Sequence, residues 1–137
     1  MIYLLDACAL LAWINEEKGK GYEAVDALLD RARTGEITIC MSIINLTEVY
    51  YGLIRDMGAE MAGKIMRDAE DLPIHIIENV TGAVYREAAR FKAAYSLSLA
   101  DVFLCATAQS LSAVVVTKDK EIAAAEQSEG LSVFWIT

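Results

Sequence analysis

Four acidic residues stand where an isolated carboxylate is costly or where a helix begins: Asp6, Glu48, Asp101 and Asp119. Asp6 and Asp119 each follow a short apolar run, while Glu48 and Asp101 lie within largely apolar stretches. A carboxylate among apolar side chains is normally paired, protonated or bound to a cation. The chain has one histidine and no basic residue at a fixed spacing from all four acids. A shared divalent metal is the simplest explanation, and a metal held by carboxylates suggests hydrolysis of phosphate esters.

Three of these acids also have a purely structural explanation. Asp6 and Asp119 each precede a predicted helix, and Asp is a preferred N-cap residue. Ser98 and Asp101 match the S-x-x-[DE] pattern of a helix start, where an acid also favours the helix dipole. Because capping and metal binding are compatible, the two interpretations remain open for each residue.

Glu48 is harder to explain by structure alone. On a helix its neighbours three and four positions away are mostly apolar, including Ile44 and Tyr51, which is unusual for a glutamate that faces solvent. Asn45 lies one turn before Glu48, so both side chains are expected to point into the same site.

The 137 residues are expected to form one domain, residues 1–137, with a substantial core. The hydrophobic fraction of 55% and the mean hydropathy of +0.34 exclude a disordered chain. No apolar run approaches the ~18 residues of a membrane span, so a cytoplasmic protein with no membrane association is expected. Cys8, Cys40 and Cys105 form no CxxC pair, which predicts reduced thiols rather than a zinc site or disulfides.

The charge balance of 12 basic and 20 acidic residues gives a net charge of -8. This argues against nucleic-acid binding through a broad basic surface. It does not exclude a nuclease, because part of the negative charge would belong to a metal site and local basic groups can hold a phosphate backbone.

Short apolar runs alternate with longer helical patterns along the whole chain. The alternation predicts an α/β fold, with a parallel central sheet of about five strands flanked by helices. The expected strands are 2–5, 36–40, 74–77, 113–116 and 131–136. The expected helices are 7–15, 22–33, 42–57, 60–70, 80–94, 99–110 and 120–127. Functional residues gather beyond the carboxyl ends of parallel strands, which is where Asp6 and Asp119 fall. The helices 42–57 and 60–70 are expected to form a projecting hairpin with a methionine-rich surface.

Segments 4–12, 44–49, 97–108 and 114–119 together resemble PIN-domain ribonucleases, specifically the VapC-type toxins of toxin–antitoxin pairs. The resemblance spans nearly the whole chain and implies a single PIN-like domain. It also implies a Mg²⁺- or Mn²⁺-dependent endoribonuclease that leaves 5′-phosphate and 3′-hydroxyl ends, a homodimer, and inhibition by a small antitoxin protein. The acidic quartet carries over to Asp6, Glu48, Asp101 and Asp119. Asp6 and Asp101 are expected to be direct metal ligands, Glu48 direct or through water, and Asp119 the loosest.

Three residues are expected beside the acids: Cys8, Asn45 and Thr117. The family usually has a hydroxyl residue two positions after its first aspartate, and here Cys8 takes that place. A thiol is a weak hydrogen-bonding group and a poor Mg²⁺ ligand. Cys8 therefore supports an alternative in which the chain is a weak or idle PIN-fold module that binds a protein. A dehalogenase-type phosphatase is disfavoured, because the segment Asp6-Ala7-Cys8 lacks the second acid of D-x-D.

Basic residues are the candidates for contacts with the RNA substrate. Arg86, Arg90 and Lys118 are preferred, and further candidates are Lys18, Lys20, Lys92 and Lys120. Solvated surface charge is the alternative explanation for all of them.

Overall fold

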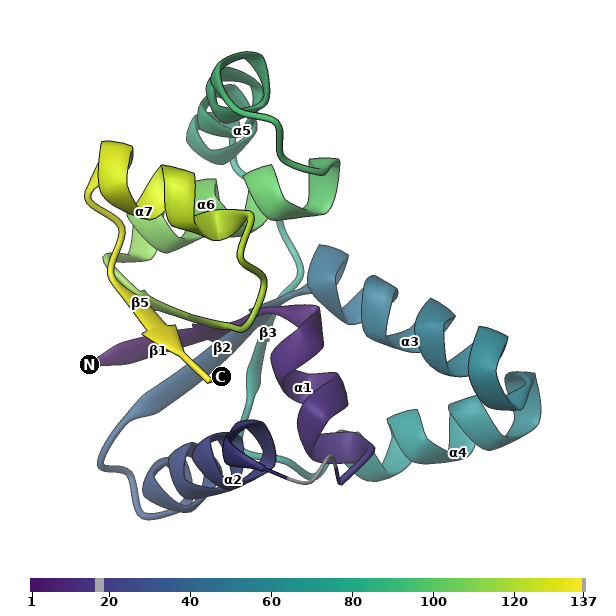
Figure 1. Ribbon diagram of the computed structural model, residues 1–137. Helices are drawn as coiled ribbons and strands as arrows, with labels where there is room; N and C mark the ends of the chain where they lie inside the picture. Colours follow the sequence, from purple (N-terminus) through teal and green to yellow (C-terminus); the bar gives the residue numbers. More distant parts are fainter. Residues whose placement is uncertain (17–18, 137) are drawn as a thin grey trace.

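Five parallel strands form the centre of the molecule in the computed structural model, which describes residues 1–16 and 19–136 (Figure 1). The order across the sheet is β3-β2-β1-β4-β5, and every neighbouring pair is parallel. The strands are β1 (Ile2–Leu5), β2 (Thr38–Ser42), β3 (His75–Ile77), β4 (Val114–Thr117) and β5 (Val133–Trp135). The predicted α/β class and the parallel sheet are confirmed.

Helices cover both faces of the sheet because successive strand residues point to opposite sides. On β1, Tyr3 and Leu5 belong to one buried cluster and Leu4 belongs to the other. The first cluster includes residues of α1 (Ala7–Ile14), α2 (Lys20–Arg33), α3 (Ile43–Met57) and α4 (Ala59–Ala69). The second includes residues of α5 (Gly82–Ala94), α6 (Leu99–Leu111) and α7 (Ile122–Glu129). Figure 1 shows α5–α7 above the sheet and α1 and α2 below it.

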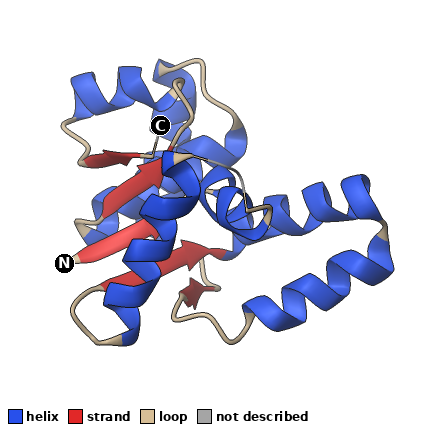
Figure 2. Ribbon diagram, turned by 60° about the horizontal axis from the view of Figure 1, so that its bottom comes forward, coloured by secondary structure: helices blue, strands red, loops and turns tan. Residues whose placement is uncertain are grey.

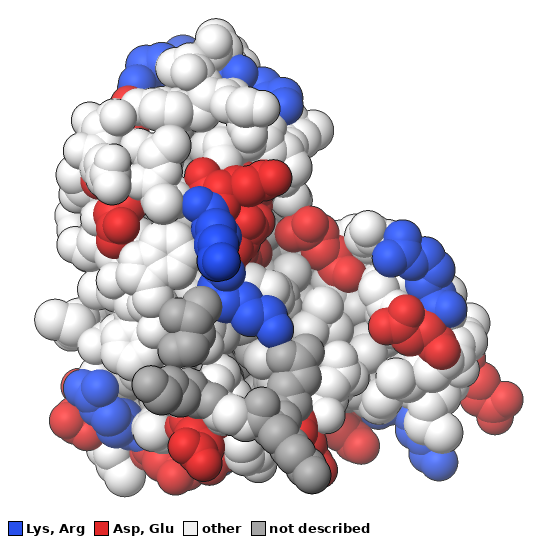
Figure 3. Space-filling model, viewed as in Figure 1, with Lys and Arg blue, Asp and Glu red and all other residues white. Residues whose placement is uncertain are grey.

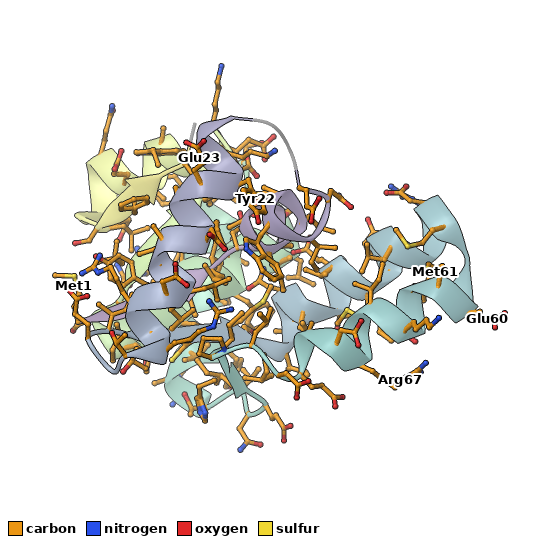
Figure 4. All side chains as sticks on the ribbon, turned by 90° about the horizontal axis from the view of Figure 1, so that it is seen from below. Met1, Tyr22, Glu23, Glu60, Met61 and Arg67 are labelled. Atoms are coloured by element: carbon orange, nitrogen blue, oxygen red, sulfur yellow. The ribbon has the colours of Figure 1, made fainter. Side chains whose placement is uncertain are left out.

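Helices α3 and α4 form the predicted hairpin, which extends away from the sheet as an arm (Figure 2). Gly58 joins them with φ of +87°, a conformation that disfavours residues with a Cβ. Val49, Leu53 and Ala62 anchor the arm in the core. Figure 4 shows Glu60 and Arg67 projecting outward from α4. Several large apolar side chains of the arm are exposed, namely Tyr50, Tyr51, Ile54, Met57 and Met61.

Some element boundaries differ from the predicted ones, for reasons of turn geometry. Strand β2 begins at Thr38 rather than at Glu36, because Gly35 and Glu36 belong to the turn that closes α2. Helix α5 begins at Gly82 rather than at position 80, with Thr81 as its N-cap. Helix α7 begins at Ile122, two residues later than predicted. No helix in the described ranges is both long enough and apolar enough to cross a membrane.

Candidate metal centre

Asp6 lies directly after β1 and caps the N-terminus of α1. One carboxylate oxygen accepts a hydrogen bond from the Ala7 amide at 2.7 Å, and the other accepts one from the Thr117 hydroxyl at 2.8 Å. The residue is only 4% exposed. Burial raises the pKa of Asp6 from 3.8 to about 6, although the hydrogen bond from Thr117 opposes this, and the nearby charge of Asp101 adds to the rise. The capping interpretation is therefore correct for Asp6, and its second oxygen faces a shared site.

Asp101 lies in the first turn of α6, where Ser98 is the N-cap. The Ser98 hydroxyl accepts a hydrogen bond from the Asp101 amide at 3.2 Å, as the S-x-x-[DE] pattern predicted. Asp101 is only 6% exposed, and it lines the same pocket as Asp6. Burial raises the pKa of Asp101, and its interaction with Ser98 partly opposes the rise.

Asp119 follows β4 by two residues in a short turn. Its amide donates to the Thr117 hydroxyl at 3.0 Å, and one carboxylate oxygen accepts from the Glu121 amide at 3.0 Å. The buried Thr117 hydroxyl therefore links the carboxylate of Asp6 to the backbone of Asp119.

The three aspartates converge although they are distant in the sequence. One carboxylate oxygen from each of Asp6, Asp101 and Asp119 lies within 4.8 Å of the others. Strands β1 and β4 are neighbours, and the chain leaves their carboxyl ends toward opposite faces of the sheet. Such a switch point is where open parallel sheets place their functional groups. Figure 3 shows acidic side chains gathered in the hollow between α5–α7 and the arm.

Glu48 reaches the same pocket from α3 but does not join the closest set of oxygens. The buried Asn45 side chain donates to Glu48 Oε1 at 3.1 Å, as expected from their spacing. Burial raises the pKa of Glu48, with smaller contributions from the charges of Asp101 and Asp119. Asp119 therefore lies in the close set of oxygens and Glu48 lies outside it, and the order in which these acids would bind a metal stays a prediction. The reason is that Glu48 extends from the arm, whereas the three aspartates follow or pack on adjacent strands.

The Cys8 thiol lies beside the hydrogen bond between Thr117 and Asp6. Its Sγ donates to Asp6 Oδ2 at 3.4 Å and lies 3.5 Å from the Thr117 hydroxyl oxygen. Burial and the charge of Asp6 raise the pKa of Cys8 to about 11, so the thiol is protonated at neutral pH. Cys8 is therefore a neutral, weak donor at the side of the acidic group.

These side chains line an open pocket of about 400 Å³. Six acids line it: Asp6, Glu48, Asp56, Asp101, Asp119 and Glu121. The ion pairs in the described part of the chain involve other acids, namely Asp30, Glu36, Glu87 and Glu129. The site therefore concentrates negative charge in partly buried surroundings, as a cation-binding site does.

The predicted RNA contacts lie outside this lining. Arg90 pairs with Glu87 and Glu129 on its own side of the molecule, which occupies its guanidinium. The Arg86 guanidinium lies over the Tyr85 ring, 5.4 Å from the ring centre. Lys118 is half-buried beside Asp119. Lys18 lies outside the described residues, as does the side chain of Lys20.

Several pocket residues were not predicted from the sequence, among them Tyr51 and Arg55 and the acids Asp56 and Glu121. Tyr51 and Arg55 lie on α3 and line the pocket together with Glu48. Their spacings of three and seven positions from Glu48 put all three on one helix face. The spacing can be read from the sequence, but only the orientation of α3 shows that this helix face lines the pocket.

The sequence matches the PIN domain family over residues 3–127. Because this match covers most of the chain, the protein belongs to the PIN domain family. No curated protein matches the sequence closely enough to count as a relative.

Solved structures share the fold at low sequence identity. VapBC2 from Rickettsia felis, solved bound to a promoter DNA fragment, is 18% identical over 100% of both chains, with a TM-score of 0.78. A toxin–antitoxin complex from Klebsiella pneumoniae is 20% identical over 88% of this chain and 90% of its own, with a TM-score of 0.64. VapC20 from Mycobacterium tuberculosis, described as a sarcin-ricin loop cleaving toxin, is 16% identical over 90% and 94%, with a TM-score of 0.68.

Proposed function

We propose that the protein is a metal-dependent endoribonuclease of the VapC toxin type. The observation that carries this proposal is the convergence of Asp6, Asp101 and Asp119 at the switch point of the sheet, with Glu48 in the same pocket. Membership of the PIN domain family and the shared fold with an RNA-cleaving VapC toxin support it.

The donor set fits Mg²⁺ or Mn²⁺. Both ions favour carboxylate oxygens and keep several waters, so three aspartates and one glutamate in an open pocket are suitable ligands. Asn45, whose amide nitrogen donates to Glu48, also has a buried Oδ1 without a hydrogen-bond partner among the described residues.

Each residue of the site has a proposed part in the reaction. When bound, the metal lowers the pKa of the attacking water and offsets charge on the phosphate. Asp6, Asp101 and Asp119 would hold the metal, and Glu48 would hold it directly or through water. Thr117 and Asn45 orient Asp6 and Glu48 through the hydrogen bonds described above. The expected products carry 5′-phosphate and 3′-hydroxyl ends.

Cleavage of total cellular RNA by the purified protein tests this proposal. Discrete fragments are expected in Mn²⁺ or Mg²⁺, but not in EDTA and not from the Asp6→Asn/Asp101→Asn variant. Persistent cleavage by that variant would assign the activity to a contaminant. Absence of cleavage by the wild-type protein, with metal binding shown separately, would refute the nuclease.

A thermal melt tests the metal site without requiring activity. Mn²⁺ at millimolar concentration should raise the melting temperature, because it binds the folded state and relieves repulsion among the acids. Asp101→Asn should blunt the response, whereas Asp68→Asn on the exposed side of α4 should not. An equal response in all three proteins would argue against a shared site.

Two protein partners follow from the same proposal: a small antitoxin and a second copy of the chain. The antitoxin is supported by the complexes in which similar folds were solved. The homodimer is supported by the exposed apolar side chains of the arm, including Tyr50, Ile54 and Met61. Light scattering of the isolated chain tests the dimer, and a monomer at micromolar concentration would contradict it.

The alternative is an idle PIN-fold module that binds a protein. Its support is Cys8, which places a thiol where a hydroxyl would bind Asp6 or phosphate more strongly. RNA cleavage by a Cys8→Ser variant distinguishes the nuclease from the idle module. Greater cleavage than by the wild-type protein would show that the thiol limits an otherwise active nuclease site.

A further inference from the structure

Arg55 is the only lysine or arginine among the described residues that line the acidic pocket. It is exposed and, within the described part of the chain, takes part in no ion pair. Its guanidinium lies over the ring of Tyr51, 5.2 Å from the ring centre. A phosphate backbone that enters a pocket of six acids needs a cation beside the metal, and Arg55 is in the position to supply it.

Tyr51 is an exposed aromatic residue beside this cation. The residue is 51% exposed and lines the same pocket, one helical turn from Glu48. A half-exposed aromatic ring held by a cation is a stacking platform for a base, and stacking requires a base that is not already paired in a duplex.

Gly52 supplies a third, independent observation. It lies in the interior of α3, where glycine is unfavourable relative to alanine. A Cβ at this position would meet only Leu11 Cδ1 at 3.9 Å, an ordinary contact, so packing against the protein does not require glycine. The missing side chain instead keeps the pocket wall open between the acids and the Tyr51–Arg55 pair.

We infer that Tyr51 and Arg55 form the contact for a single-stranded segment of the substrate. Arg55 binds a phosphate other than the one that is cleaved, about 10 Å along α3 from Glu48, and Tyr51 stacks on a neighbouring base. Gly52 leaves room for the strand to pass. This inference rests on the proposed nuclease function and specifies its substrate as unpaired RNA.

Fluorescence anisotropy with a short labelled single-stranded RNA tests the inference in Mn²⁺, in an Asp101→Asn background that prevents cleavage. Arg55→Gln should raise the Kd about tenfold. It should also flatten the dependence of log K on log salt by about 0.7, the slope expected for one phosphate contact on a single strand. Tyr51→Leu should raise the Kd about tenfold without changing the slope. Gly52→Leu should weaken binding by filling the pocket.

Arg67→Gln and Tyr85→Leu provide the controls, because Arg67 is an exposed arginine of α4, Tyr85 is an exposed tyrosine of α5, and neither lines the acidic pocket. Both variants should leave the Kd and the slope unchanged. The inference is overturned if Arg55→Gln leaves the salt slope unchanged, if Arg67→Gln flattens it equally, or if a duplex RNA binds as tightly as the single strand. RNA that binds normally in these tests while wild-type protein fails to cleave would count against the proposed function and not against this contact.

Discussion

Replacing Asp6 by Asn should make the metal-free protein more stable at neutral pH. Each unit of pKa change corresponds to about 1.4 kcal/mol. The rise in the pKa of Asp6 from 3.8 to about 6 therefore means that the charged side chain destabilises the metal-free fold by about 3 kcal/mol. Asn carries no charge, but it leaves the Thr117 hydroxyl without its carboxylate acceptor, which costs about 1 kcal/mol. The expected net gain is about 2 kcal/mol.

The pH dependence of this gain is diagnostic. Because the folded state binds the Asp6 proton more tightly than the unfolded state, lowering the pH through 6 stabilises the wild-type protein. This stabilisation amounts to about 2 kcal/mol between about pH 7.5 and about pH 4.5. The advantage of Asp6→Asn should therefore fall to near zero at the lower pH.

Urea unfolding in EDTA, followed by far-ultraviolet circular dichroism, measures both quantities. Asp68→Asn, at an exposed position on α4, is the matched control and should change stability little at either pH. A loss of stability in Asp6→Asn at neutral pH, or a gain that does not depend on pH, would refute the view that a buried charge limits the metal-free fold.

Three further measurements probe other parts of the structure. Thr117→Val removes the hydroxyl that binds Asp6 and should weaken Mn²⁺ binding about tenfold in a calorimetric titration; unchanged affinity would contradict its orienting role. Arg90 holds the pKa of Glu129 at about 2, so this pair stabilises the fold above about pH 4.5 and loses that effect as the pH falls through 2. Arg90→Ala should therefore reduce the fall in melting temperature that the wild-type protein shows at acidic pH. An unchanged fall would show that this ion pair does not contribute to the loss of stability in acid. Burial raises the pKa of Cys105 to about 12, so mass spectrometry after thiol labelling at about pH 8 should find it unmodified until urea unfolds the chain.

The strands and three of the site acids could be predicted from the sequence because their causes are local. A short apolar run followed by Asp6 indicates a buried strand and a helix start within a few residues, and Asp119 follows the same rule. Asp101 could be placed because Ser98 and the following apolar run define a helix N-terminus. In each case the neighbours in the sequence are also the neighbours that determine the conformation.

The remaining features depend on tertiary geometry. Glu48 was assigned to the site, but its distance from the aspartates depends on the direction in which α3 leaves the sheet. Tyr51 and Arg55 were missed for the same reason, since their helix face becomes a pocket wall only when α3 packs beside α1 and α6. The ion pair of Arg90 could not be predicted either, because its partner Glu129 lies 39 positions away and no local sequence pattern indicates the pair.

The hydrogen bond between Thr117 and Asp6 joins residues 111 positions apart. During translation, a chain that has emerged only as far as α5 carries Asp6 and Glu48 but lacks β4, which is an interior strand of the sheet. Neither the paired carboxyl ends of β1 and β4 nor the set of three aspartates can exist on the ribosome at that stage. Under the proposed function, the nascent protein is harmless to RNA until α6 and β4 have been made and have folded. The arm, whose two helices are made much earlier, is available to a partner before the enzyme becomes active.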